Sequence, residues 1–343
     1  MTAQRGPFAT GIRGTGSFLP AGTVSNEVVA ERAGVTAEWI VCKTGIRERR
    51  YAGEGEATSD LAVAAAEAAL VDAGVEARQL GWIVVATSTP DHPQPATASL
   101  VQHRLGATGA AAFDLNAVCS GFVFALVTVA RLVAADAAEE GRYGLVVGAD
   151  VYSRIIDPSD RRTAVLFGDG AGAVVLGPVR SGYGIVGSDL TSFGRHHDMI
   201  EVPAGGSRKP ASEKTLASGE HYFQMQGRAV REFVTAELPA SISRLLAICA
   251  TEPHEVDHLV PHQANGAMLL DVLPGLGLPR ARTHLTVAGH ANTGAASVPL
   301  ALDTARRQRH FSDGDTLLLA GFGGGMSVGT VLLRWDTAAA PAR

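Results

Sequence analysis

Cys119 is the residue in this sequence best placed to act as a nucleophile. It lies in residues 113–126, where a short apolar strand is expected to lead directly into an apolar helix. Unpaired backbone N–H groups and the positive end of the helix dipole stabilise a thiolate at a helix N-terminus, so we expect a lowered pKa there. A free cysteine is often only a small buried residue, but the strand-to-helix setting favours nucleophilic catalysis.

Two further polar residues follow strands that are expected in the second half of the chain. His262 lies in residues 260–265 and Asn292 in residues 289–299, each at a strand end or in the turn after it. Each residue alone would more often belong to a core or a turn. If the two halves pack about a pseudo-twofold axis, however, strand ends from both halves converge. The sequence therefore predicts that Cys119, His262 and Asn292 meet at one site.

Two glycine-rich segments also follow or precede predicted strands. Residues 321–325 follow an apolar strand, and backbone N–H groups without side chains beside them can approach a ligand closely. This arrangement suits an oxyanion hole, although a tight turn would also require glycine. The G-x-G-x-x-G spacing and the following helix of a dinucleotide site are absent. Residues 167–172 are interpreted as a structural turn into a strand.

Apolar runs bounded by Gly and Pro alternate with Ala-rich segments of helical length, which is typical of an α/β fold. Strands are predicted at residues 11–18, 82–87, 112–116, 143–149, 171–176, 258–261, 316–320 and 328–335. Helices are predicted at residues 59–73, 97–105, 120–135, 228–250, 267–273 and 295–307.

The order of these elements recurs along the chain. The block at residues 82–176 returns at residues 258–335 with a nearly constant separation, which indicates an internal duplication. We divide the chain into residues 1–178, the half that carries the cysteine nucleophile, and residues 179–343, the half that carries the histidine and the asparagine. Residues 191–219 lack periodicity and are interpreted as a surface excursion between the halves.

The composition of the 343-residue chain is that of a globular protein, with 46% hydrophobic and 18% charged residues. A net charge of −5 gives no basic field for nucleic acid or an anionic membrane, and we expect no apolar stretch of bilayer-spanning length. Cys42, Cys119 and Cys249 lack the spacing of a disulfide framework or a zinc site. Residues 1–8 lack the pattern of a secretory leader, so we expect a cytoplasmic protein.

Six blocks of residues, 38–50, 116–122, 167–172, 261–265, 292–297 and 321–325, together span nearly the whole chain. In order and spacing they resemble the β-ketoacyl-acyl-carrier-protein synthase III family of the thiolase superfamily. The resemblance implies a duplicated thiolase fold with five layers, α/β/α/β/α, in a homodimer with an active site at the base of a pantetheine tunnel. It implies no metal or organic cofactor, because coenzyme A thioesters are the substrates.

The resemblance also implies a role for each reactive residue. Cys119 would carry an acyl group, and His262 and Asn292 would promote decarboxylation of a malonyl thioester by hydrogen-bonding the enolate. Backbone N–H groups of Cys119 and Gly324 would form the oxyanion hole. Two other functions stay open: acyl transfer from Cys119 to an alcohol, amine or thiol without decarboxylation, and a non-catalytic protein that binds acyl thioesters.

Other positions concern binding. Phe322 would form a wall of the active site, and Trp39, Lys43 and Arg161 would contact coenzyme A; Lys43 replaces an arginine and lacks its planar guanidinium. Residues 266–276 contain no Lys or Arg, although members that bind acyl carrier protein often present basic residues there. An acidic carrier protein would be steered less well. We therefore favour a specialised member, in secondary metabolism, that takes both substrates from coenzyme A.

Overall fold

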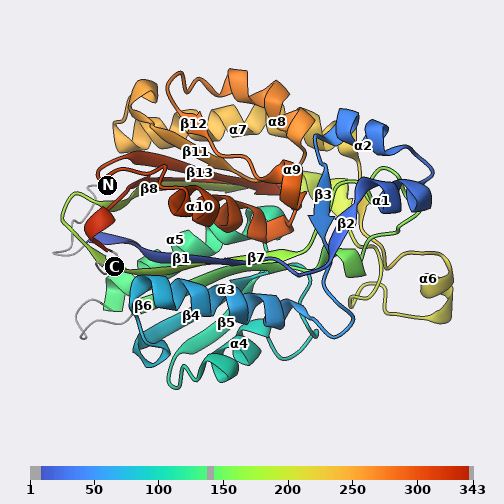
Figure 1. The fold of residues 1–343 in the computed structure, drawn as a ribbon, viewed down its shortest axis with the longest axis horizontal. Helices are drawn as coiled ribbons and strands as arrows, with labels where there is room; N and C mark the ends of the chain where they lie inside the picture. Colours follow the sequence, from blue (N-terminus) through green and yellow to red (C-terminus); the bar gives the residue numbers. More distant parts are fainter. Residues whose placement is uncertain (1–8, 137–142, 340–343) are drawn as a thin grey trace.

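The chain folds into five layers in the order helix, sheet, helix, sheet, helix (Figure 1). This computed structural model describes residues 9–136 and 143–339. Two five-stranded mixed sheets enclose a central pair of helices, and further helices cover the outer face of each sheet. The predicted five-layer α/β fold is confirmed. Residues 1–8, on which the prediction about a secretory leader rests, lie outside the described ranges.

The first sheet has the strand order β1-β7-β6-β4-β5. Its strands are β1 (Ala9–Phe18), β4 (Leu80–Ala86), β5 (Ala111–Leu115), β6 (Tyr143–Asp150) and β7 (Gly170–Val179). β4 runs parallel to β5 and β6, whereas β7 runs antiparallel to β6 and β1. The central strands are almost continuous runs of small and β-branched apolar residues, because both faces of the sheet are covered. Helices α3 (Thr58–Ala73) and α4 (Thr97–Leu105) cover the outer face.

The second sheet has the strand order β12-β11-β13-β14-β8. Its strands are β8 (Gly184–Ser192), β11 (His258–Pro261), β12 (Arg282–Thr283), β13 (Thr316–Gly323) and β14 (Ser327–Arg334). Helices α7 (Gly227–Cys249) and α8 (Gly266–Val272) cover it. Order and strand direction repeat those of the first sheet, with β11 matching β4, β13 matching β6 and β14 matching β7. The division of the chain at residues 178 and 179 stays a prediction.

The central layer consists of α5 (Gly121–Ala135) and α10 (Ser297–Arg307). α5 is apolar on nearly all sides because it lies between two sheets. Our expectation that no stretch reaches bilayer-spanning length is wrong, since Val118–Ala135 is long and apolar enough by length and composition. The physical reason lies in the fold, because 61% of this stretch is buried inside the protein.

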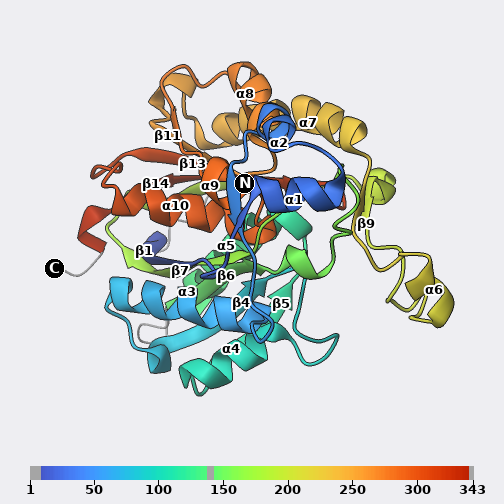
Figure 2. The same ribbon diagram turned by 45° about the vertical axis from the view of Figure 1, so that its right-hand side comes forward.

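Shorter elements connect the layers, and the sequence pattern predicted none of them. Near the N-terminus they are β2 (Thr23–Ser25), α1 (Asn26–Ala33), α2 (Ala37–Thr44) and β3 (Glu48–Arg50). Later in the chain they are β9 (Ile200–Glu201), α6 (Glu213–Ala217), β10 (Gln224–Met225) and α9 (Val287–His290). α6 stands away from the layers at one side of the molecule, as expected for a surface excursion (Figure 2).

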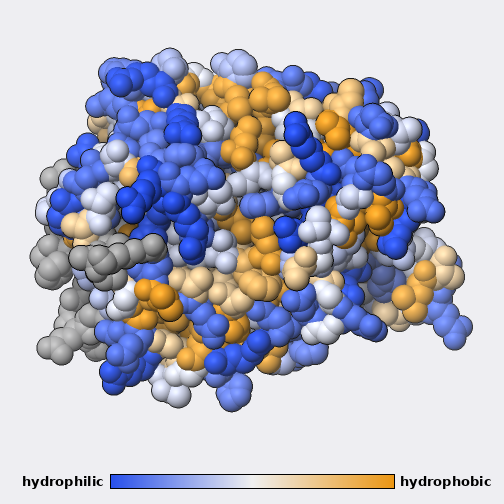
Figure 3. Space-filling model, in the orientation of Figure 1, coloured by the Kyte–Doolittle hydropathy of each residue, from blue (hydrophilic) through white to orange (hydrophobic). Residues whose placement is uncertain are grey.

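The outer surface is mixed in character. On the face seen in Figure 3, hydrophobic side chains reach the surface in several separate groups between hydrophilic ones. Exposed apolar residues include Val71 on α3 and Leu270 on α8. Scattered apolar residues of this kind are ordinary on protein surfaces.

Candidate active site

Cys119 lies in a single 3₁₀ turn, Val118–Ser120, that leads from β5 into α5. Its side chain is only 6% exposed. The end of β13 packs directly against it, since a β-carbon added to Gly323 would come 2.8 Å from the Cys119 Cβ atom. Val118 has a φ of 48°, which is a strained conformation for a β-branched residue. The predicted strand-to-helix setting is present, with glycine from the other half closing over the cysteine.

The protonation state of Cys119 differs from our expectation. Burial raises the pKa of Cys119 to about 12, and the Asp150 carboxylate adds to the increase. Hydrogen bonding from Tyr152 and from the backbone acts in the opposite direction. The predicted lowering of the pKa is wrong for the free protein, because loss of water around the sulfur outweighs the stabilisation from the helix N-terminus. The resting group is therefore the thiol.

Asp150 ends β6 and is fully buried. Its Oδ1 atom accepts hydrogen bonds from Thr87 Oγ1 at 3.1 Å, Ser88 N at 2.8 Å and Thr89 Oγ1 at 3.0 Å. Its Oδ2 atom accepts one from the Ala295 N–H at 2.8 Å. Burial raises the pKa of Asp150, whereas these donors oppose the increase. The carboxyl group ties the ends of β4 and β6 to a turn that belongs to the second half of the chain.

Backbone contacts fix Asn292 in that turn. Its N–H donates to the Leu166 carbonyl oxygen at 2.9 Å, and its own carbonyl oxygen accepts from the Gly168 N–H at 3.0 Å. The side-chain Oδ1 atom accepts from the Gly294 N–H at 2.9 Å. With the amide oxygen engaged in this way, the side chain offers its NH₂ group as a donor. The glycine-rich segment 167–172, which we interpreted as a structural turn into a strand, leads into β7 and also holds the backbone of Asn292 through Gly168.

His262 follows β11 and is 1% exposed. Its backbone N–H donates to the Ala320 carbonyl oxygen at 2.7 Å. The imidazole packs edge-on against the ring of Phe322, with 5.0 Å between ring centroids. Burial lowers the pKa of His262 to about 3, so the imidazole is neutral near pH 7. Phe322 thus lies against the histidine, and its role as an active-site wall stays a prediction.

The direction in which the Ser297 hydroxyl donates its hydrogen bond determines which nitrogen of the His262 ring carries the proton. The Ser297 Oγ atom lies 2.9 Å from Nδ1 and 2.7 Å from the Gly294 carbonyl oxygen. A hydroxyl that donates to Nδ1 leaves the N–H on Nε2, where it can reach a substrate. A hydroxyl that donates to the carbonyl oxygen requires the N–H on Nδ1 and leaves Nε2 as an acceptor. The histidine can therefore accept or donate without becoming charged.

Tyr152 packs against the same turn. It is 1% exposed, and its hydroxyl lies 2.9 Å from Ser88 Oγ. A β-carbon added to Gly294 would come 2.5 Å from Tyr152 Cε2. Gly294 bonds to the asparagine and to the serine beside the histidine, and the turn Gly294–Ala296 lies against the turn Val118–Ser120 that carries Cys119.

The glycine loop after β13 lies beside the nucleophile. A β-carbon added to Gly324 would come 3.1 Å from the Val118 Cγ2 atom, just before the cysteine in the chain. Ser327 holds the loop, because its Oγ atom donates to the Gly324 carbonyl oxygen at 3.1 Å and lies 2.7 Å from Ser120 Oγ. A side chain at Gly324 would therefore be tightly packed, and the oxyanion role of Gly324 stays a prediction.

The residues expected to bind coenzyme A lie further out. Trp39 and Lys43 are on α2, where Trp39 is half-buried against an apolar cluster and Lys43 is exposed. The Lys43 carbonyl oxygen accepts from Asn265 Nδ2 at 3.2 Å, which joins α2 to the segment after His262. Arg161 is exposed in a turn that precedes β7. The structure does not test their contact with coenzyme A, which stays a prediction.

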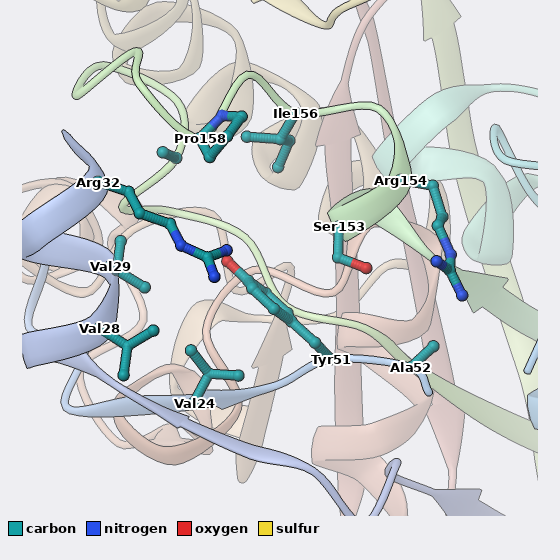
Figure 4. A pocket seen from close by; sticks show the side chains of 11 residues that line it. Val24, Val28, Val29, Arg32, Tyr51, Ala52, Ser153, Arg154, Ile156 and Pro158 are labelled. Atoms are coloured by element: carbon teal, nitrogen blue, oxygen red, sulfur yellow. The ribbon is translucent and has the colours of Figure 1, made fainter. Parts of the chain in front are cut away.

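A separate cavity of about 250 Å³ lies between α1 and the segment that follows β6. Its walls combine apolar side chains with polar ones, and Arg32 and Tyr51 reach toward each other inside it (Figure 4). None of the reactive residues, and none of the three predicted coenzyme A contacts, lines this cavity. It is therefore distinct from the site described above.

Three residues of the site, Asp150, Tyr152 and Ser297, were not predicted from the sequence. A signal existed for each of them. Asp150 follows directly on the predicted strand at residues 143–149, at the same edge of the sheet as the other functional residues, and Tyr152 comes two positions later. Ser297 closes one of the six blocks that carry the family resemblance. Their partners could not be read from the sequence, because each contact crosses between distant segments.

Comparison with known proteins agrees with this architecture. The family 3-oxoacyl-[acyl-carrier-protein (ACP)] synthase III matches residues 113–194, and the family for its C-terminal part matches residues 246–335. Acetoacetyl CoA synthase NphT7 from Streptomyces sp. (strain CL190) is 54% identical over 326 residues. That similarity covers 94% of this chain and 98% of the relative.

Solved structures give the same result. The 3-oxoacyl-(acyl carrier protein) synthase III from Pseudomonas aeruginosa PAO1 matches with a TM-score of 0.86 and 40% identity, over 96% of this chain and 99% of its own. The priming β-ketosynthase from the R1128 polyketide biosynthetic pathway matches with a TM-score of 0.88 and 31% identity, over 98% and 99% of the two chains. On these grounds the chain belongs to the 3-oxoacyl-[acyl-carrier-protein] synthase III family of the thiolase superfamily.

Proposed function

We propose that this protein loads an acyl group from acyl-coenzyme A onto Cys119 and condenses it with a malonyl thioester, with loss of carbon dioxide. The observation that carries the proposal is the set of contacts around residues 292–297, which joins a neutral imidazole and an amide donor and lies against the turn of the buried thiol. A cysteine suits the covalent half of this reaction. Two neutral donors suit the half in which an enolate forms.

In the loading half-reaction, the Cys119 sulfur attacks the thioester carbonyl carbon. A bond from carbon to the Cys119 sulfur forms, the bond to the coenzyme A sulfur breaks, and the cysteine proton ends on the released coenzyme A thiol. Since the pKa of Cys119 is about 12, proton removal must accompany the attack, and the neutral imidazole of His262 can carry the proton between the sulfurs. The N–H groups of Cys119 and Gly324 would stabilise the oxyanion.

In the condensing half-reaction, the malonyl thioester loses its carboxylate as carbon dioxide and leaves an enolate. His262 Nε2–H and the Asn292 NH₂ group would donate to the enolate oxygen, which requires the Ser297 hydroxyl to donate to Nδ1. The enolate carbon attacks the acyl carbonyl group, a carbon–carbon bond forms, and the bond to the Cys119 sulfur breaks. A proton from water then restores the thiol.

Coenzyme A, rather than a carrier protein, is the proposed carrier of both substrates. Arg231 on α7 is an exposed basic residue near the predicted docking surface, but its NH2 atom lies 2.7 Å from Asp271 Oδ2 on α8. Because α8 itself carries no Lys or Arg, this ion pair reduces the positive charge that is available to an acidic partner. The name of the Streptomyces relative, an acetoacetyl CoA synthase, supports the same choice. We place the reaction in secondary metabolism.

The remaining parts of the proposal concern assembly and location. β5 lies at the edge of the first sheet, and its residues are exposed or half-buried in the single chain, which suits pairing with a second copy in a homodimer. We propose a cytoplasmic protein that needs no metal or organic cofactor. Within residues 9–136 and 143–339, no group of three or more His, Cys, Asp and Glu residues could hold a metal ion.

The proposal is tested by separating the two half-reactions. Purified protein is incubated with acyl-coenzyme A donors, and the acyl group on Cys119 is detected by intact mass and peptide mapping. Malonyl-coenzyme A or a malonyl carrier protein is then added, and carbon dioxide and product are measured. Loading followed by carbon dioxide release is the expected result. Loading without carbon dioxide release, with transfer to an alcohol, amine or thiol, would contradict condensation, and faster reaction with the carrier protein would contradict the proposed carrier.

A further inference from the structure

A second cavity, of about 200 Å³, lies between β12 and the C-terminal end of α10. Its walls include the basic residues Arg282, His284 and His310 and the neutral polar residues Thr286 and Gln308. Among the described residues that line this cavity, none is acidic. The mechanism proposed above uses none of these residues. Walls that carry basic groups and neutral donors, without a carboxylate, suit an anionic ligand.

Arg282 and His310 contact each other at this cavity. The Arg282 Nη2 atom lies 2.9 Å from His310 Nε2. Because a guanidinium group can only donate, His310 Nε2 is the acceptor and the proton of the neutral ring lies on Nδ1. That Nδ1 atom is buried and has no hydrogen-bond partner in the part of the chain that the structure describes. The arginine therefore donates to a neutral ring rather than to a carboxylate, and the pair has no anionic acceptor.

His284 packs against His310 but is already engaged on its other side. The rings of His284 and His310 stack with 5.3 Å between centroids. His284 Nε2 lies 3.1 Å from His258 Nδ1, and His258 Nε2 lies 3.0 Å from Asp315 Oδ2. Burial and the neighbouring basic groups lower the pKa of His284 to about 4, so this ring stays neutral above pH 5. His310 is therefore the ring in the cavity that can take up a proton.

Protonation of His310 would change its contact with Arg282. An imidazolium carries N–H on both nitrogens, so it can no longer accept from the arginine and both groups become donors. The two arginines of α10 cannot supply an acceptor, because Arg307 is paired with Asp303 and Arg306 with Asp72. An anion that enters the cavity would accept from both groups and would offset their two positive charges.

We propose that this cavity binds a tetrahedral dianion of the phosphate or sulfate type between Arg282 and a His310 ring that takes up a proton as the anion binds. The guanidinium group and the protonated Nε2 donate to two oxygens of the anion. Thr286 and Gln308, whose side chains have no hydrogen-bond partner among the described residues, add neutral donors. This site is independent of the proposed condensation.

The proposal is tested by isothermal titration calorimetry with sodium sulfate at an ionic strength held constant with sodium chloride. Sulfate is a suitable probe because it stays doubly charged between pH 6 and 8, whereas phosphate does not. We expect a single sulfate per chain, bound about 10-fold more tightly at pH 6 than at pH 8, because an adjacent anion raises the pKa of a histidine. Titrations at pH 7 in two buffers with different heats of ionisation should show a net uptake of protons.

Two variants assign this binding to the cavity. Arg282→Gln should weaken sulfate binding by about 10-fold or more, the range in which loss of a hydrogen bond between charged groups falls. His310→Gln should abolish the proton uptake and leave the same affinity at pH 6 and pH 8. The matched control is Arg280→Gln, which removes the same charge from an exposed arginine that does not line the cavity and should bind sulfate like the parent protein.

The absence of sulfate binding at pH 6 would overturn the proposal, as would equal weakening by Arg280→Gln and Arg282→Gln, which would indicate unspecific attraction to surface charge. Proton uptake that persists in His310→Gln would overturn the role of the histidine. If Arg282→Gln does not fold, His310→Gln gives the same test. Inorganic phosphate and glycerol phosphate are then made to compete with sulfate. Competition by phosphate alone identifies a free ion as the ligand, competition by both identifies a phosphate ester, and competition by neither contradicts the site.

Discussion

The strands that match between the two halves end in different residues: polar side chains in the first half, and a neutral ring and glycines in the second. In the first half, β4 is followed by Thr87 and Ser88, and β6 ends at Asp150, which accepts hydrogen bonds from both. In the second half, β11 is followed by a neutral histidine, and β13 ends in glycines that pack against Cys119. Topology and strand direction are nevertheless the same.

This difference shows how two halves with the same topology can contribute different residues to a single site. The polar side chains of the first half fill the space at their strand ends and fix the turn that carries Asn292, through the Ala295 N–H. The second half places glycine and an uncharged ring at the corresponding strand ends, and the glycine end packs closely against Cys119. In the proposed mechanism the first half supplies the nucleophile and its support, and the second half supplies the donors for the enolate.

The largest effect on activity should come from mutating, one at a time, the reactive residues that the two halves contribute. Cys119→Ala should remove covalent loading and reduce condensation by at least about 10⁴-fold, because the nucleophile itself is lost. His262→Ala and Asn292→Ala should each lower carbon dioxide release by about 10²-fold or more while part of the loading is retained. Intact mass and carbon dioxide measurements record the two steps. Covalent loading of Cys119→Ala would show that the assignment of roles to the two halves is wrong.

A smaller effect on activity should follow when a side chain is added at the glycine end of β13, since the matching end of β6 already carries the Asp150 side chain. In Gly323→Ala, the new methyl group would lie 2.8 Å from the Cys119 Cβ atom and 2.9 Å from its backbone nitrogen. We expect about 1–3 kcal/mol of destabilisation, since overpacking of a closed core costs this much. Loading should slow at least about 10-fold as Cys119 shifts, which corresponds to about 1.4 kcal/mol in the barrier.

Gly275→Ala is the matched control for this variant, because nothing lies within 4 Å of its added β-carbon. Thermal melting and the rate of loading are measured for both. A Gly323→Ala protein that melts and loads like the control would mean that the closeness of β13 to the cysteine has no functional importance.

Because His262 is neutral in the folded protein, we expect the free energy of unfolding to depend on pH. The pKa of His262 is about 3 in the folded protein, below the value near 6.5 of an exposed histidine. The unfolded chain therefore binds the proton first, and stability is lost as the pH falls from about 6.5 toward 3, with about 2 kcal/mol lost from this residue by pH 5. Urea unfolding at pH 8, 6 and 5 measures the loss.

His262→Gln should make that stability profile flatter than in the parent protein. His284→Gln should remove a separate contribution to the pH dependence of stability, since burial and the nearby His258 lower the pKa of His284 to about 4. If His262→Gln and the parent lost the same stability between pH 8 and 5, the histidine would not be neutral in the folded state.

The smallest effect concerns the surface of the second half. Asp271→Ala would release Arg231 from its exposed ion pair and restore a positive charge beside α8. We expect the kcat/KM for a malonyl carrier protein to rise about two- to fivefold, because exposed charges contribute at most about 1 kcal/mol. The kcat/KM for malonyl-coenzyme A should stay the same, and a rise for both substrates would contradict the predicted role of this surface.

The sequence predicted the layers well because hydrophobic periodicity is a local property. It did not predict β8, whose residues Gly184–Ser192 mix glycine and polar groups and form a strand only by pairing with β14. The short capped helices α1 and α2 gave too weak a pattern. The pKa of Cys119 was predicted in the wrong direction because its burial depends on Gly323, a residue distant in the chain that closes over it. Such contacts between halves lie beyond any local pattern.

The burial of Cys119 affects how readily its sulfur is oxidised. Peroxide oxidises the thiolate form of cysteine far faster than the thiol, and reactive sensor cysteines combine a low pKa with free access to solvent. Cys119 has neither property, with a pKa of about 12 and 6% exposure. If Cys119 is the nucleophile, as proposed, its thiol should resist peroxide between turnovers, because the charged form that peroxide attacks is scarce in the free protein.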